Sequence, residues 1–139
     1  MRKIILLAAL LLVLDWAVAQ TRTPSPKGAE VDIISPADGA VVKSPVRVRF
    51  GLKGMGIAPA GIAFENSGHH HLLIDTDPPT DLSQPVPVSD KFVHFGKGQT
   101  EAEIALAPGK HTLQLLLGDH LHVPHDPPVM SRRITITVQ

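Results

Sequence analysis

The sequence predicts an all-β domain, an antiparallel β-sandwich of the immunoglobulin-like type with about seven strands. Short runs rich in Val, Ile, Leu, Phe and Thr recur along the chain, Gly- and Pro-containing turns separate them, and no convincing helical period follows the first twenty residues. A cysteine pair, a core Trp and a tyrosine corner, the hallmarks of antibody domains, are absent from the sequence. The prediction therefore depends on strand number and spacing, and a small Greek-key barrel is the alternative.

The predicted strands follow one another at short intervals. The turn PADG ends the first strand, and in the second, apolar residues at every other position from Val46 to Leu52 alternate with arginines, which indicates one buried face. The turn APGK precedes HTLQLLL, in which His111 shares a face with three leucines, and the last strand alternates Ile and Val with Thr. In order, the predicted strands are 31–35, 46–52, 70–75, 91–95, 100–106, 110–117 and 133–138.

The first 19 residues are predicted to be a cleavable secretory signal peptide. A charged head precedes an apolar run at 4–14, which is too short to span a bilayer as a helix, and small residues follow at 17–19. Residues 20–29, QTRTPSPKGA, are polar and Pro-containing and predict a flexible leader. We expect a periplasmic or secreted protein without a membrane anchor after cleavage, with residues 30–139 as its one domain.

Composition argues against several classes of function. Basic and acidic residues balance at 13 each, so the chain lacks the positive surface that binds nucleic acid. Without cysteine it has no disulfide, thiolate metal site or cysteine nucleophile. Nothing in the sequence indicates an organic cofactor. The residue in excess is histidine, with eight copies.

Strand direction predicts where the histidines gather. If successive strands alternate in direction, the connections after the second, fourth and sixth strands lie at one end of the sandwich. Seven of the eight histidines lie in or beside these connections, whereas His111 belongs to the other end and is expected to be structural. The connection after the second strand contributes three histidines, and the Pro-rich connection 118–130 contributes three more. The seven are His69, His70, His71, His94, His120, His122 and His125.

The alternation of side chains along a strand selects among them. His69 and His71 point to one face with Cα atoms about 6.6 Å apart, so both can turn toward one cation. His70 is in phase with Leu72 and Ile74, the expected core face, although a slip of one residue would exchange these roles. We expect His69, His71, His94 and His122 as metal ligands, with His120 and His125 next. The predicted auxiliary groups are His70, Glu65, Asp75, Asp119 and Asp126.

Three stretches, GHHHLLID, KFVHFGKGQTEAEIAL and PGKHTLQLLLGDHLHVPHDPPV, together resemble a bacterial exported family known as domain of unknown function 4399. The resemblance covers about residues 30–138. It implies an immunoglobulin-like exported domain and emphasises the histidine segments, the HFGxG turn and the PGKHTL strand. It implies no established activity.

Three functions remain open. Imidazole with nearby carboxylates suits Cu(II) or Zn(II), which favours a metal-binding module acting as a carrier, buffer or sensor. The alternative is a non-catalytic interaction module that contacts another cell-envelope protein and uses the histidines as a structural network. A metal-dependent enzyme is the third, because catalytic sites keep an open coordination position. Ser67 lacks the G-x-S-x-G surroundings of a hydrolase nucleophile.

Overall fold

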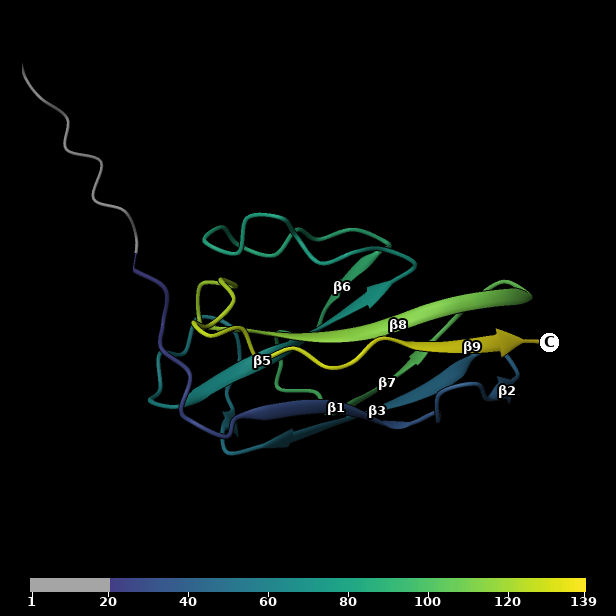
Figure 1. The fold of residues 1–139 in the computed structure, drawn as a ribbon, viewed down its shortest axis with the longest axis horizontal. Helices are drawn as coiled ribbons and strands as arrows, with labels where there is room; N and C mark the ends of the chain where they lie inside the picture. Colours follow the sequence, from purple (N-terminus) through teal and green to yellow (C-terminus); the bar gives the residue numbers. More distant parts are fainter. Residues whose placement is uncertain (1–20) are drawn as a thin grey trace, which may run out of the picture.

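The computed structural model describes residues 21–139, so the predicted signal peptide lies outside the described residues. These residues form two β-sheets that pack face to face (Figure 1), as the sequence predicts. All seven predicted strands are present, and two strands of two residues join them. Within this range no helix is long and apolar enough to cross a membrane. The strands are β1 (Glu30–Ser35), β2 (Val41–Val42), β3 (Val46–Lys53), β4 (Gly56–Ile57), β5 (Ser67–Ile74), β6 (Phe92–His94), β7 (Glu101–Ile104), β8 (Gly109–Gly118) and β9 (Ile134–Val138).

The sheet topology excludes the barrel alternative. One sheet has the order β1-β3-β7, and the other has the order β2-β9-β8-β5-β4, with β6 also paired to β5. The block β5-β8-β9 corresponds to the C, F and G strands of immunoglobulin-like sandwiches. In constant-type immunoglobulin domains the fourth strand, D, pairs with the fifth, E. Here β6 takes the place of the fourth strand, but it pairs with β5, which corresponds to strand C. This pairing sets His94 directly opposite His71.

The main core lies between the two sheets. Val48 and Phe50 of β3 pack toward Leu72 of β5 and Leu115 of β8, and all four are buried. The arginines between the buried positions of β3 are exposed, which confirms the predicted alternation. Strand phase thus fixes which side chains of β5 face the core.

The outer face of the six-stranded sheet is covered as well. Leu73 and Leu116 lie on this face and pack with Val86 from the connection 76–90. Figure 1 shows this connection beyond β5, β6 and β8, on the side away from β1 and β3. Because both faces are covered, every residue of β5 is buried.

The segment before β1 packs against the domain. The N–H of Ser25 donates to the carbonyl of Asp126 at 3.0 Å, and the N–H of Asp126 donates to the carbonyl of Thr23 at 2.9 Å. Arg22 also forms an ion pair with Asp126 at 3.5 Å. The composition of this segment predicts a flexible leader. The packing could not be predicted, because backbone hydrogen bonds to a distant loop leave no compositional signal. The packed structure therefore extends to residues before β1.

Candidate metal centre

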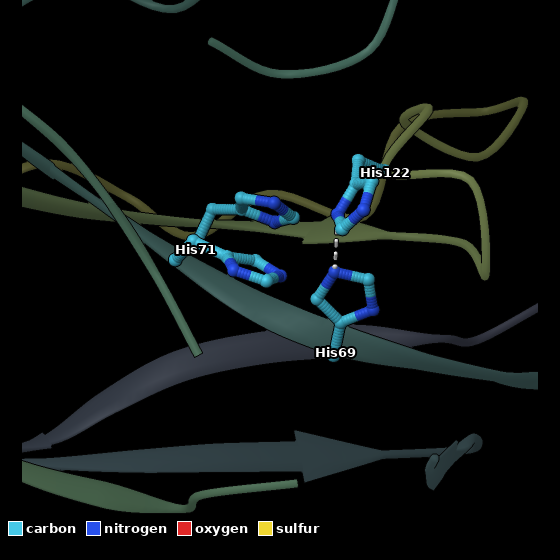
Figure 2. Close-up of side chains that lie close together, drawn as sticks. His69, His71 and His122 are labelled. Atoms are coloured by element: carbon cyan, nitrogen blue, oxygen red, sulfur yellow. Dashed lines mark hydrogen bonds between the residues drawn. The ribbon is translucent and has the colours of Figure 1, made fainter. Parts of the chain in front are cut away.

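Four histidine side chains meet on the outer face of the six-stranded sheet. One nitrogen from each lies within 4.8 Å of the others. They come from β5, β6 and the loop after β8, so the three predicted segments converge. Figure 2 shows the rings of His69, His71 and His122 turned toward one another. We call these four residues the histidine cluster: His69, His71, His94 and His122.

Alternation along β5 places two of the four rings. His69 and His71 lie on the same face with ring centroids 4.8 Å apart. His70 points to the opposite face, where its ring centroid is 5.1 Å from that of Phe50. The predicted phase is therefore confirmed, and the one-residue slip does not occur.

The third ring comes from β6, and two glycines make room for the rings. The His94 ring centroid lies 4.9 Å from that of His69 and 5.1 Å from that of His71. A Cβ on Gly96 would lie 2.6 Å from His94 Nε2, and one on Gly118 would lie 2.6 Å from His71 Cε1. Sequence reasoning missed both glycines, although the HFGxG pattern places Gly96 two residues from the predicted ligand His94.

The fourth ring belongs to a loop residue in a special backbone conformation. His122 has a φ of 67°, a left-handed value that side-chain-bearing residues seldom adopt. Its carbonyl accepts a hydrogen bond from the N–H of Val86 at 2.9 Å. Its Nδ1 lies 3.1 Å from His69 Nε2, a hydrogen bond drawn in Figure 2. The loop after β8 and the connection 76–90 therefore both contribute to the position of the His122 ring.

Burial lowers the pKa of three rings of the cluster, those of His69, His71 and His94. His69 and His71 are fully buried, and burial together with neighbouring imidazoles lowers the pKa of His71 to about 3 and that of His69 to about 4. Burial, followed by the nearby His122, also lowers the pKa of His94. At neutral pH these rings are neutral, the form in which imidazole offers a lone pair to a metal.

Several imidazole nitrogens are buried without a hydrogen-bond partner. Leaving such a group unsatisfied costs about 1–3 kcal/mol. Within residues 21–139 every buried side-chain atom of this kind belongs to a histidine, and most belong to the cluster. A bound cation would engage one nitrogen on each ring of the cluster. The unpartnered atoms are His69 Nδ1, His70 Nδ1 and Nε2, His71 Nδ1 and Nε2, His94 Nε2 and His125 Nδ1.

The spacing of the nitrogens suits a transition metal. Metal–nitrogen bonds of about 2.0–2.1 Å in a tetrahedron set the nitrogens about 3.3 Å apart. The contact between His69 and His122 is already near this value at 3.1 Å. The widest separation is no more than 4.8 Å, which exceeds the tetrahedral spacing by about 1.5 Å.

The other predicted ligands lie elsewhere. His125 is fully buried, and its Nε2 lies 3.2 Å from the carbonyl oxygen of Ser67, at the start of β5. His120 lines a separate cavity of about 220 Å³ together with Glu65. His70 lies between the sheets, and burial lowers its pKa to about 4. The structure does not bring these four side chains into the cluster.

The predicted auxiliary aspartates have other partners. Asp75 lies at the far end of β5, where Oδ2 is 2.7 Å from His111 Nδ1. His111 Nε2 is also 2.8 Å from the carbonyl of Ala107, so this histidine is hydrogen-bonded, as expected. Asp126 is exposed and pairs with Arg22. Asp119 lies in the loop of His122, where backbone and hydroxyl donors occupy both of its carboxylate oxygens.

Comparison with known families agrees with the sequence motifs. The model of the family named domain of unknown function 4399 matches residues 48–139. The chain belongs to this family. No curated protein and no solved structure matches the chain. The matched region contains every member of the histidine cluster.

Proposed function

We propose that the domain binds a divalent transition metal, Cu(II) or Zn(II), through the histidine cluster. The observation that carries this proposal is the meeting of four imidazole nitrogens from three segments within 4.8 Å. Nitrogen ligands of this kind suit Zn(II) and Cu(II), whereas Ca²⁺ and Mg²⁺ prefer oxygen. Burial of His69 and His71 in the neutral form prepares the site for a cation.

The completeness of the ligand set favours binding over catalysis. Catalytic zinc sites usually keep three protein ligands and one open position, whereas sites with four protein ligands hold the ion without chemistry. Four imidazoles are available here, and two of them are fully buried. We therefore infer a carrier, buffer or sensor, which the predicted signal peptide would direct to the periplasm or outside the cell.

Calorimetric titration of the purified protein with Zn(II) and Cu(II) tests this proposal. His71→Leu should weaken binding by more than about 100-fold, because it removes a ligand directly rather than a supporting group. His70→Leu is the matched control, since it makes the same change one residue away on the other face of β5. A dissociation constant of the unmodified protein no tighter than about 100 µM would refute the proposal, because exposed histidines alone can reach that value.

A second function has one observation in its favour. The hydrogen bond between His69 and His122 joins two rings of the cluster directly, so the rings could serve as a structural network beneath an interaction surface. Ile62, Phe64 and Leu121 are exposed hydrophobic residues on the neighbouring loops. On this alternative, metal and chelator would leave the unfolding temperature unchanged, and a partner protein would be recovered with the domain from a cell-envelope extract.

A further inference from the structure

A clamp centred on one buried carboxylate organises the loop that carries His122. Asp119 is 4% exposed. Its Oδ1 accepts hydrogen bonds from the N–H groups of Leu121 at 2.8 Å and Val123 at 3.0 Å, and its Oδ2 accepts one from the hydroxyl of Thr23 at 2.6 Å. With both oxygens occupied, this carboxylate acts on the loop and does not face an ion.

The clamp also reaches the backbone of the ligand. The N–H of His122 donates to the carbonyl of Asp119 at 2.9 Å, and the N–H of Asp119 donates to the carbonyl of Val123 at 2.9 Å. The left-handed φ of His122 is unfavourable for a residue with a side chain, so the surroundings must hold it. The hydrogen bonds of Asp119 close the loop around this residue.

Electrostatics keep the carboxylate ionised. Burial alone would raise the pKa of Asp119, but the hydrogen bonds from Thr23, Leu121 and Val123 outweigh burial and lower it. Hydrogen bonds to a charged acceptor are stronger than those between neutral groups. The contact with Thr23 is therefore a strong link between segments that lie 96 residues apart in the sequence.

Neighbouring contacts extend this link along the N-terminal segment. The Arg22 guanidinium donates to the carbonyl of Pro124 at 3.0 Å and to the carbonyl of His125. The N–H of Ser25 donates to the carbonyl of Asp126. Residues 22–25 thus run beside the C-terminal half of the ligand-bearing loop.

We propose that Thr23 and Asp119 are positioning residues for metal binding, which hold His122 Nδ1 at the distance from His69 that the ion requires. This inference rests on the proposed function. Neither residue contacts the ion, and both act through the conformation of residues 119–123. Linkage makes the effect reciprocal, so a bound ion stabilises the clamp by the same factor by which the clamp raises metal affinity.

Thr23→Val tests the proposal, because it removes the hydroxyl and keeps the shape of the side chain. We expect zinc affinity to fall about 10-fold, which is the lower end of the loss that follows when a group supporting a metal ligand is removed. Thr23→Ser keeps the hydroxyl and should restore the affinity. Thr76→Val is the matched control, since the Thr76 hydroxyl bonds only the neighbouring Asp77 carbonyl, at 3.4 Å. Equal affinity of Thr23→Val and the unmodified protein would overturn the inference.

Amide hydrogen exchange without metal provides a readout that separates the two proposals. In Thr23→Val the N–H groups of Leu121 and Val123 should exchange faster, while the N–H of Leu115, which donates to Ser131 Oγ, keeps its rate. If the unmodified protein binds no metal, the proposed function fails, and faster exchange would still show that Thr23 positions the loop. Unchanged exchange at Leu121 and Val123 would refute the positioning role whether or not metal binds.

Discussion

Gly118→Ala is expected to damage the proposed metal site with a single methyl group. Gly118 lies on β8 opposite His69, and an added Cβ would stand 2.6 Å from His71 Cε1. An ordinary contact is at least 3.4 Å, so the His71 ring would have to move by about 0.8 Å. The methyl would also lie 3.3 Å from the backbone of His122, which limits escape in that direction.

The size of the effect follows from the tolerance of metal–ligand bonds. Productive distances lie within about 0.2 Å of the ideal value, so a displacement of about 0.8 Å removes His71 as a ligand or strains the others. We expect zinc affinity to fall by at least about 10–100-fold, the loss typical when a group that orients a metal ligand is mutated. Packing the extra methyl should also lower the free energy of unfolding by about 1–3 kcal/mol.

Competition of the protein with a fluorescent zinc chelator measures the affinity, and urea unfolding measures the stability. Gly56→Ala is the control, because a Cβ there meets no atom within 4 Å and its backbone needs no left-handed φ. This variant should bind zinc as the unmodified protein does. A folded Gly118→Ala protein with unchanged zinc affinity would show that the position of the His71 ring does not matter for binding.

Three further predictions concern the titration and the packing of the histidines. The metal-free protein should lose stability as pH falls from 6.5 toward 4, because burial lowers the pKa values of His69 and His70 to about 4 and of His71 to about 3, so the unfolded chain binds more protons. Each such proton contributes about 1.4 kcal/mol per pH unit, and equal urea midpoints at pH 7 and pH 5 would contradict this. The hydrogen bond that His111 donates to the Asp75 carboxylate raises the pKa of His111, so Asp75→Asn should lower this pKa in an NMR titration without changing zinc affinity. His70→Leu should raise the free energy of unfolding by about 1–3 kcal/mol in urea, since it removes two unpartnered nitrogens from the core, and destabilisation would count against this.

Local rules were sufficient for much of the fold and for the main feature of the site. The two-residue period of β5 predicts that His69 and His71 share a face and that His70 faces the core, and the structure confirms both. Alternating strand direction predicts that β6 and the loop after β8 approach the start of β5. These rules depend on backbone geometry alone, which sequence pattern reports well.

The rest depends on tertiary contacts that no local pattern encodes. His120 and His125 lie in the same loop as His122, but the hydrogen bonds of Asp119 and the left-handed φ at His122 direct only one of the three rings into the cluster. The burial of the outer face depends on Val86, which lies in the irregular connection 76–90 between β5 and β6. The contact of Thr23 with the loop joins two irregular segments, for which periodicity gives no signal.

The hydrogen bond between His69 and His122 shows what ion binding would require of the rings. The two facing imidazole nitrogens, 3.1 Å apart, share one hydrogen, which either ring can carry. An ion held by both nitrogens needs both lone pairs, so this hydrogen must move to the other nitrogen of its own ring. On His69 that atom is Nδ1, which is buried without a partner. With an ion held by both nitrogens, each of the two rings would carry its hydrogen on the nitrogen that faces away from the ion. The partly exposed His122 can donate that hydrogen to water more readily than the fully buried His69 can.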